Sequence, residues 1–595
     1  DRHRGIRVYL WSRNSSMILY LQDRGGNENW QLFAVDLETG EERCLTPQDN
    51  VTSRILGLSW EFPDDIVVAL NDRDQSWHDI YRLNMRVGDS HLMFRNDQEF
   101  GSFTLDRKLQ LKLAEKSLPE GGRQIFRVKQ NQTEIEINEL LKIPHEDDLT
   151  TGVVGFDVDG EEFYLISSLG RDKAALEKRN WKTESKTVIG EHSNADISQI
   201  LVHPTSFQVQ AYGANHIKLE WTCIDNDIQN DLDHLSSNVS GEILVTSRTR
   251  DDRIWIVTSS SAEMPGTSYL FRRDERLLSQ VGSTYPELES EALRPMTGHI
   301  ITSRDDMNLV SYLTLPEISP KPENDLRPTS PVPLVLLVHG GPWARDVYGF
   351  NSTHQWLANR GYAILSVNFR GSTGFGKNFV NAGDLQWGAK MHDDLIDAVE
   401  WAVNEGIADP EKVAIMGGSY GGYAALVGLT FTPDVFACGV DIVGPSNLQT
   451  LIETIPPYWK SFFENFARRM GDPRTPEGKQ LLEERSPINR TSKITKPLLI
   501  GQGSNDPRVK QAESDQIVEA MKHNGLPVTY VLYPDEGHGF ARPENRMSFN
   551  AIAEAFLSTH LGGRAEPIGS DFDGASFEVQ AGREHIPGLL KDKTD

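Results

Sequence analysis

Short runs of apolar residues separated by polar turns fill the first half of the chain. The runs occur in sets, which begin near Val8, Leu56, Phe103, Val153, Ile200 and Ile243. A spacing of roughly 45 to 50 residues is that of the blades of a β-propeller, in which small sheets bury their faces against one another. We count about six sets over residues 1–295. The same density of strands also fits a β-sandwich or several small β-domains.

From about residue 296 the pattern changes to apolar strands that alternate with amphipathic helices. We predict strands near 333–338, 362–367, 412–416, 438–443, 497–501 and 527–532. We predict helices near 352–360, 389–405, 420–430, 509–524 and 546–560. This alternation is typical of a doubly wound, mostly parallel sheet, which binds ligands at the carboxyl ends of its strands. We assign residues 296–563 to an α/β-hydrolase domain and 564–595 to a polar C-terminal tail.

A Gly-x-Ser-x-Gly pattern joins one predicted strand to the next helix. Ser419 has Gly417 and Gly421 two residues to either side, after the apolar run that begins at Lys412. In this setting the pentapeptide predicts a nucleophile elbow, where glycines allow a sharp turn that lifts the serine above the sheet. A plain glycine-rich turn between strand and helix is the alternative.

The base and the acid that a serine nucleophile needs should follow Ser419 in the chain, in the order acid and then histidine. His538 lies in a glycine-flanked loop directly after the strand that ends near Leu532. Asp506 follows the preceding strand and is our candidate for the acid. The alternative for Asp506 is a helix cap. Asp535 and Glu536 are rivals for the acid because they neighbour His538 in sequence.

The oxyanion of an acyl-transfer intermediate needs two preorganised donors. The backbone N–H of Tyr420, directly after the nucleophile, is one candidate. The other should come from the loop His339-Gly340-Gly341-Pro342, where we choose Gly341 and keep Gly340 as the alternative. His339 precedes the elbow in the chain, so we interpret it as a structural hydrogen-bonding residue and not as the base.

Composition and charge limit the partners. The chain has 595 residues and a formal net charge of −26, which argues against nucleic acids and anionic membranes as partners. No apolar run reaches the length of a membrane helix. Three widely spaced cysteines form neither a disulfide framework nor a zinc pattern, so we expect a reducing compartment and a cytoplasmic protein. We expect neither a metal nor a cofactor, and whether the chain forms a homo-oligomer stays open.

Four segments together resemble the prolyl oligopeptidase family, and within it most closely the acylaminoacyl-peptidase branch. They are His339–Pro342, Asn368–Gly376, Gly417–Tyr423 and Asp535–Gly539. The resemblance covers about 300–562 and implies the triad Ser419, Asp506 and His538, with Gly341 and Tyr420 at the oxyanion. It also implies a seven-bladed propeller, here truncated or with one blade unrecognised. Tyr458 and Trp459 would lie near the substrate pocket, although core packing explains such aromatic residues equally well.

We therefore expect a serine peptidase that hydrolyses short peptides, of the oligopeptidase or acylaminoacyl-peptidase type, through an acyl-enzyme. A carboxylesterase with the same triad and a catalytically inert binding scaffold are the alternatives. The dipeptidyl-peptidase branch of the resembled family holds a free amine with paired glutamates on its propeller. We find no counterpart of that pair in the sequence, which disfavours this activity.

Overall fold

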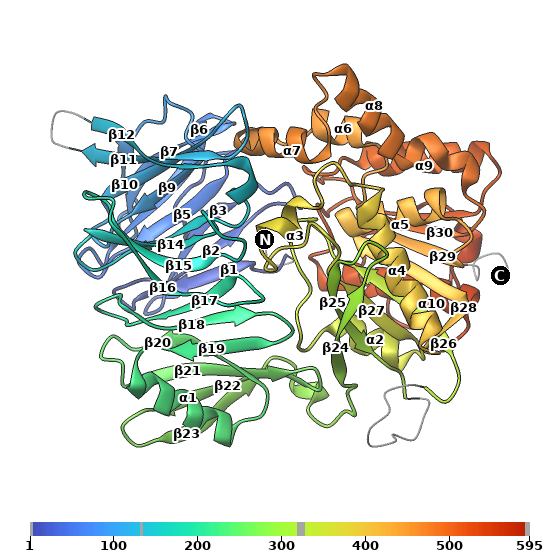
Figure 1. The fold of residues 1–595 in the computed structure, drawn as a ribbon, viewed down its shortest axis with the longest axis horizontal. Helices are drawn as coiled ribbons and strands as arrows, with labels where there is room; N and C mark the ends of the chain where they lie inside the picture. The colour runs from blue at the N-terminus through green and yellow to red at the C-terminus, as the bar shows by residue number, and fades with distance from the viewer. Residues whose placement is uncertain (1–3, 131–134, 318–327, 590–595) are drawn as a thin grey trace.

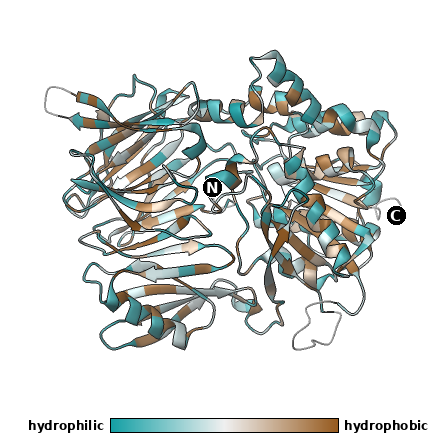
Figure 2. Cartoon of the chain, in the orientation of Figure 1, coloured by the Kyte–Doolittle hydropathy of each residue, from teal (hydrophilic) through white to brown (hydrophobic). Residues whose placement is uncertain are grey.

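A computed structural model describes residues 4–130, 135–317 and 328–589 of the chain. Its two halves differ in architecture: a ring of small antiparallel sheets packs against a domain built on one large sheet (Figure 1). Figure 2 shows apolar residues gathered along the strands of the large sheet, whereas polar residues cover outward-facing helices such as α8 (Pro476–Arg485).

Six separate sheets make up the first half, each built from consecutive strands. The first three blades are β1–β4 (Val8–Trp11, Met17–Gln22, Gln31–Asp36, Glu42–Cys44), β5–β8 (Ser53–Leu58, Asp65–Asp74, Trp77–Asn84, Ser90–Phe94) and β9–β12 (Ser102–Leu105, Leu111–Ser117, Arg123–Gln130, Ile135–Ile143). The next three are β13–β16 (Gly152–Phe156, Glu162–Ser167, Ala175–Asn180, Lys186–Gly190), β17–β19 (Ile197–Val202, Val209–Asn215, Leu219–Cys223) and β20–β23 (Glu242–Arg248, Ile254–Ser261, Met264–Arg272, Leu277–Ser283).

The number of blades corrects one expectation. The described residues form six blades, and the seventh that the family resemblance implied is not among them. The apolar sets of the sequence counted the blades correctly, because each set supplies the core between two successive sheets. For example, Leu19 of the first blade and Val68 of the second lie in one buried cluster. The fifth blade has three strands, and the amphipathic helix α1 (Asn226–Asn238) follows them and buries Ile228 and Leu235.

A nine-stranded sheet forms the core of the second half, in the order β24-β25-β27-β26-β28-β29-β30-β31-β32. Its strands are β24 (Met296–Thr302), β25 (Asn308–Thr314), β26 (Val332–Val338), β27 (Ala363–Val367), β28 (Ala408–Gly418), β29 (Cys438–Ile442), β30 (Leu498–Gly503), β31 (Val528–Tyr533) and β32 (Glu578–Ala581). The strands from β27 to β31 are parallel. At one edge β25 pairs antiparallel with both β27 and the outermost strand β24, and at the other edge β32 pairs antiparallel with β31. The strand β32 lies within the segment that we assigned to a tail.

Helices cover both faces of this sheet. The helices α2 (Ser352–Asn359) and α10 (Pro543–Leu561) pack on one face, and α4 (Lys390–Asn404), α5 (Tyr420–Phe431) and α9 (Gln511–His523) pack on the other. Each face of the sheet has its own apolar core. Alternate residues of β26 point to opposite faces, so Leu334 packs in one core and Val335 in the other. Four further helices of the described part of the domain were not predicted from the sequence pattern: α3 (Lys377–Asn381), α6 (Leu448–Glu453), α7 (Phe463–Met470) and α8.

Candidate active site

Ser419 sits on a sharp turn between β28 and α5. Its backbone has φ 58° and ψ −116°, a strained conformation for a residue other than glycine. A Cβ at Gly417 would lie 2.5 Å from the carbonyl oxygen of Val338, and one at Gly421 would lie 2.1 Å from the same atom. Only glycine fits at these two positions, so the turn has the features of a nucleophile elbow.

The strand beside the elbow supports it. The backbone N–H of Ser419 donates a hydrogen bond to the carbonyl of Ile442 at 2.8 Å. Asp441 accepts a hydrogen bond from the N–H of Gly444, and burial raises the pKa of its carboxyl to about 8. A Cβ at Gly422 would come within 2.2 Å of this carboxyl group, so α5 packs directly against it.

His538 lies against the Ser419 hydroxyl, although the two residues are 119 positions apart in the chain. The Nε2 atom of His538 is 2.9 Å from Ser419 Oγ, and its Nδ1 atom is 2.7 Å from Asp506 Oδ2. Because a carboxylate only accepts, Nδ1 carries the hydrogen, which leaves the lone pair of Nε2 for the serine proton. The geometry is that of a nucleophile, a base and an orienting acid.

Asp506 is held in place by its own loop. Its Oδ1 atom accepts hydrogen bonds from the backbone N–H groups of Arg508 at 2.8 Å and Val509 at 2.9 Å, and its side chain is fully buried. The two rivals point elsewhere. Asp535 contacts Arg542, Asn545 and Ser576, and Glu536 contacts Arg4, Arg542 and Asn545.

The two predicted oxyanion donors, Gly341 and Tyr420, line one cavity together with Ser419 and His538. His339 fixes the peptide unit that carries the N–H of Gly341, because its Nδ1 atom donates a hydrogen bond to the carbonyl of Gly340 at 2.7 Å. The His339 ring stacks on Phe369 with centroids 4.6 Å apart, and Phe369 stacks on Tyr420 at 5.1 Å. Side chains thus link the two donor segments, and His339 is placed as a structural residue.

The cavity at Ser419 has a volume of about 120 Å³ and a mostly apolar lining. Its lining residues are Gly341, Trp387, Ser419, Tyr420, Pro445, Leu451, Ile452, Ile455, Trp459, Phe466, Met470, Arg508, Val509 and His538. Of the two residues predicted to lie near the substrate, Trp459 lines this cavity. Tyr458 turns to the propeller instead, where its hydroxyl donates a hydrogen bond to Glu28 at 3.0 Å. Burial, and next the Glu28 charge, raise the pKa of Tyr458.

A loop of the first blade contacts the loops that carry Asp506 and His538, which the sequence pattern did not reveal. The loop between β2 and β3 places Glu28 2.9 Å from the guanidinium of Arg508, next to the acid loop. Asn505 of that loop donates a hydrogen bond to the carbonyl of Gly25 at 2.7 Å. A Cβ at Gly26 would lie 2.1 Å from the backbone nitrogen of Gly537, beside His538. We name residues 23–28 the clamp loop.

The clamp loop has little sequence signal of its own. Glu28 adopts φ 57°, and it is 8% exposed although it carries a charge. Two adjacent glycines, Gly25 and Gly26, are the only hint of a close backbone approach that the residues before it offer. Arg508 could have been found from its position, two residues after the predicted acid.

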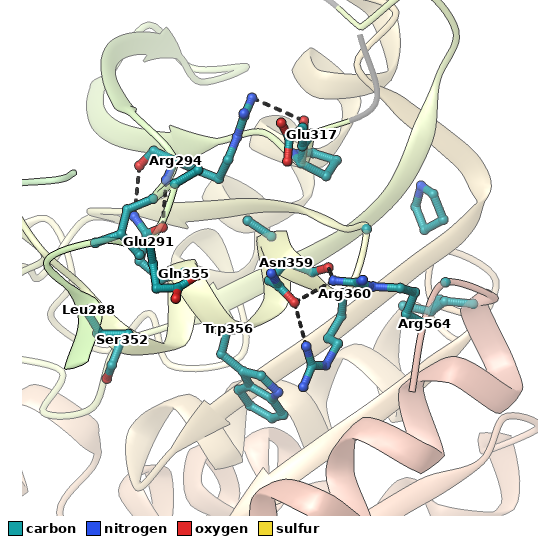
Figure 3. A pocket seen from close by; sticks show the side chains of 18 of the residues that line it. Leu288, Glu291, Arg294, Glu317, Ser352, Gln355, Trp356, Asn359, Arg360 and Arg564 are labelled. Carbon is teal, nitrogen blue, oxygen red and sulfur yellow. Dashed lines mark hydrogen bonds between the residues drawn. The ribbon is translucent and has the colours of Figure 1, made fainter. Parts of the chain in front are cut away.

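A larger cavity of about 1060 Å³ lies elsewhere on the domain (Figure 3). Residues of α2, the segment 288–294 and the end of α10 line it, among them Arg294, Gln355, Arg360 and Arg564. None of its lining residues belongs to the cavity at Ser419, so it takes no part in the arrangement described above.

The described ranges hold neither a metal-binding cluster nor a membrane-spanning helix. They contain no group of three or more histidine, cysteine and acidic residues placed to hold a metal ion. No helix within them has the length and apolar character that crossing a membrane requires.

An α/β-hydrolase sheet with a serine elbow, a histidine and a buried aspartate at its strand ends, covered by a β-propeller, defines a class of serine hydrolases. Residues 348–564 match the prolyl oligopeptidase family profile. Dipeptidyl aminopeptidase BIII of Pseudoxanthomonas mexicana is 53% identical over 591 residues, 99% of this chain and 85% of that protein. The chain belongs to the prolyl oligopeptidase family and is a serine peptidase.

The chain is also similar to an acylamino-acid-releasing enzyme in sequence and to a puromycin-hydrolyzing peptidase in fold. An acylamino-acid-releasing enzyme of Arabidopsis thaliana is 31% identical over 215 residues, 36% of this chain and 28% of that protein. A puromycin-hydrolyzing peptidase of Mycobacterium tuberculosis shares the fold, with a TM-score of 0.73 at 19% identity over 94% of this chain and 88% of that one. The relatives thus include an acylamino-acid-releasing enzyme, the type that the sequence analysis favoured. They also include a dipeptidyl aminopeptidase, the type that it disfavoured.

Proposed function

We propose that the chain is a dipeptidyl aminopeptidase that releases dipeptides from the free N-terminus of short peptides. The observation that supports catalysis is the chain of contacts from Asp506 through His538 to Ser419, with distances of 2.7 and 2.9 Å. The observation that supports the substrate is the carboxylate of Glu28, which the propeller places against Arg508 beside the cavity.

The chemistry follows from the arrangement. The Ser419 hydroxyl attacks the scissile carbonyl while Nε2 of His538 takes its proton, and Asp506 stabilises the imidazolium that forms. The backbone N–H groups of Gly341 and Tyr420 bind the oxyanion. His538 then donates its proton to the leaving amine, which leaves an acyl-enzyme ester on Ser419. Water activated by His538 hydrolyses that ester.

Recognition of the amine rests on charge. A carboxylate offers about four lone-pair sites, and Arg508 and Tyr458 use only part of them at Glu28. A substrate ammonium group can share the remainder. The apolar lining of the cavity suits an apolar side chain next to the scissile bond. The similarity to acylamino-acid-releasing enzymes favours a second candidate, removal of a blocked N-terminal residue, for which an anionic Glu28 is a poor partner.

The test compares matched substrates. The panel contains a dipeptide p-nitroanilide with a free amine, its N-acetylated form, an N-acetyl amino acid p-nitroanilide and a short ester, with Ser419→Ala as the background. We expect kcat/KM for the free amine to exceed that for the acetylated form at least tenfold. Glu28→Gln should remove this preference, whereas Glu38→Gln, on an exposed turn of the same blade, should keep it.

Each contrary result has a defined meaning. A preference for the N-acetyl amino acid would replace the proposal with the acylaminoacyl-peptidase activity. Turnover of the ester without any amide would replace it with a carboxylesterase. Absence of all turnover, together with absence of fluorophosphonate labelling, would leave an inert scaffold.

A further inference from the structure

The propeller carries a cluster of arginine and aromatic side chains at the end that faces away from the α/β domain. The turns between the second and third strands of the blades contact that domain, as Gly26, Gly121 and Asp172 do. Successive turns of an antiparallel sheet lie at opposite ends, so the turns between first and second strands occupy the outer end. These outer turns carry Arg13, Trp60, Arg107, Phe207 and Arg250.

The side chains of this outer cluster contact one another across the blades. The guanidinium groups of Arg13 and Arg250 both stack on Trp60, at 5.0 and 5.4 Å from the ring centroid. Arg107 stacks on Phe207 at 3.6 Å, and its Nε donates a hydrogen bond to the carbonyl of Phe156 at 3.1 Å. Every one of the six blades contributes a residue to these contacts. Ser59, next to Trp60, donates a hydrogen bond to the carbonyl of Arg107 and joins the two parts of the cluster.

Among the described residues, no carboxylate forms an ion pair with an arginine of the outer cluster. The Nε atom of Arg13 is buried and has no hydrogen-bond partner within the described part of the chain. Burial lowers the pKa of Arg13, with no acid acting against it. Burial, and next the charge of Arg13, lower the pKa of Arg107 to about 10. Two half-buried guanidinium groups of like charge repel each other, and an anion between them would offset that repulsion.

The acids that face Arg107 are engaged in their own turns. Asp106 accepts hydrogen bonds from the backbone N–H groups of Lys108 and Gln110, and Asp157 accepts from those of Gly160 and Glu162. Both carboxylates act on Arg107 only as charges nearby. Neither forms an ion pair with it within 4.0 Å among the described residues. The free donors of the cluster are therefore available to an external group.

We propose that the outer end of the propeller binds a small oxyanion, a carboxylate or a phosphate group, between the guanidinium groups of Arg13 and Arg107. The planar guanidinium fork matches the oxygens of both groups, and the aromatic faces of Trp60 and Phe207 hold the two forks in place. A bound anion links turns of several blades, so it stabilises the ring. The site is separate from Ser419 and serves no step of the hydrolysis.

Calorimetric titration and thermal unfolding of the full chain test this site. The probes are inorganic phosphate and an N-acetyl dipeptide with a free C-terminus, with its C-terminal amide as the uncharged match, all in chloride buffer of equal ionic strength. We expect saturable binding of phosphate, of the free-carboxylate peptide or of both, and a rise in Tm of about 2–4 °C at saturation. The two anionic probes separate a phosphate from a peptide carboxylate as the ligand.

Variants then assign the site. Arg13→Gln and Arg107→Gln should each weaken binding about ten- to a hundredfold, because each removes charged hydrogen bonds. Lys108→Gln removes one positive charge from the turn that carries Arg107, but at an exposed position. This variant should bind the anion as tightly as the native chain does. Arg13→Lys keeps the positive charge but loses the planar guanidinium group. It replaces Arg13→Gln in the binding measurement if Arg13→Gln fails to fold. Without added anion, Arg13→Gln should melt no lower than the native chain, because a half-buried charge with no ion-pair partner among the described residues is gone.

Three outcomes would overturn the proposal. The first is the absence of saturable binding of either anionic probe. The second is equal weakening by Lys108→Gln and Arg13→Gln, which would show general charge attraction. The third is undiminished binding in both Arg13→Lys and Arg107→Gln.

Discussion

The two halves of this peptidase bring residues together in different ways. In the α/β domain, parallel strands end at one edge of a single sheet, so residues as distant in the chain as Ser419 and His538 meet there. In the propeller, each sheet pairs consecutive strands, and its cores join neighbouring blades. The large sheet therefore builds the catalytic geometry, whereas the propeller reaches the site only through its turns.

The clamp loop is the propeller segment that contacts the loops of Asp506 and His538 in the α/β domain. Its contacts with the α/β domain described above go to the loops that carry Asp506 and His538 and to Tyr458, and none of them goes to the strand that carries Ser419. Ser419 is fixed by the tight packing of Gly417 and Gly421 within its own domain. The difference indicates that the propeller supports the loops of His538 and Asp506, whereas the turn at Ser419 is held by its own domain.

The largest effect should come from the acid. Asp506→Asn keeps the size of the side chain but cannot hold the imidazole in the same tautomer, so kcat should fall about 10⁴-fold. Steady-state kinetics with a dipeptide anilide measure the loss. Asp535→Asn is the control, because Asp535 points to Arg542 and Ser576. A larger loss in the control than in Asp506→Asn would reassign the acid.

A smaller but still large effect should come from the propeller side of the site. In Gly26→Ala, the new Cβ would meet the backbone of Gly537 at 2.1 Å and displace the loop of His538, which should lower kcat by roughly tenfold to a hundredfold. Gly40→Ala is the matched control, because Gly40 also has positive φ, 70°, but no atom lies within 4 Å of its Cβ position. Equal activity of the two variants would show that the clamp loop does not support the base.

Acid should destabilise both halves through buried neutral histidines. Burial lowers the pKa of His354 in the α/β domain and of His78 in the propeller from 6.5 to about 3. The unfolded chain takes up protons below its pKa of 6.5 while the folded groups stay neutral. Their stabilisation is therefore full above pH 6.5 and is lost as pH falls toward 3, by at most about 1.4 kcal/mol per pH unit for each histidine.

Substitution of each histidine measures how much each half contributes to the loss of stability in acid. His354→Gln and His78→Gln should each flatten the dependence of unfolding free energy on pH between 6.5 and 4, measured by urea titration at several pH values. His523→Gln, at the polar end of α9, should leave the slope unchanged. Slopes that stay the same in both buried variants would show that other groups control acid unfolding.

The smallest effect should come from the contact between the domains at Tyr458. Tyr458→Phe removes the hydrogen bond to Glu28, which is worth about 1 kcal/mol, so KM for a free-amine dipeptide substrate should change only a fewfold. Kinetics of the acetylated substrate provide the comparison, since that substrate has no ammonium group. A hundredfold loss of kcat would instead place Tyr458 in the catalytic machinery.

The sequence predicted the α/β domain well because apolar periodicity and chain order both report on a parallel sheet. The six predicted strands from β26 to β31 and the five predicted helices all occur within a few residues of their expected positions. The short helices α6, α7 and α8 lack a strand between them, so no alternation marks them. In the propeller, the apolar sets located each blade, but the seventh blade came from the family resemblance alone and is absent from the described residues.

In the candidate site, too, the residues of the α/β domain could be predicted from the sequence, whereas the contacts with the propeller could not. Ser419, Asp506 and His538 each follow a predicted strand, so topology alone brings them to one edge. Glu28 and Arg508 could not be paired from the sequence, because their contact depends on how a propeller turn docks on another domain. The hydrogen bond from the Tyr458 hydroxyl to Glu28 depends on the same docking, so the sequence could not reveal it either, and the prediction that Tyr458 lies near the substrate stays a prediction.

Labelling with a fluorophosphonate tests the central claim most directly, because the reagent reacts much faster with an activated serine than with an ordinary one. Peptide mapping by mass spectrometry identifies the modified residue in the native chain, in Ser419→Ala and in His538→Ala. The account predicts one modified residue, Ser419, in the native chain, much slower labelling without His538 and none in Ser419→Ala. Stable modification at another serine, or full peptidase activity in Ser419→Ala, would contradict it.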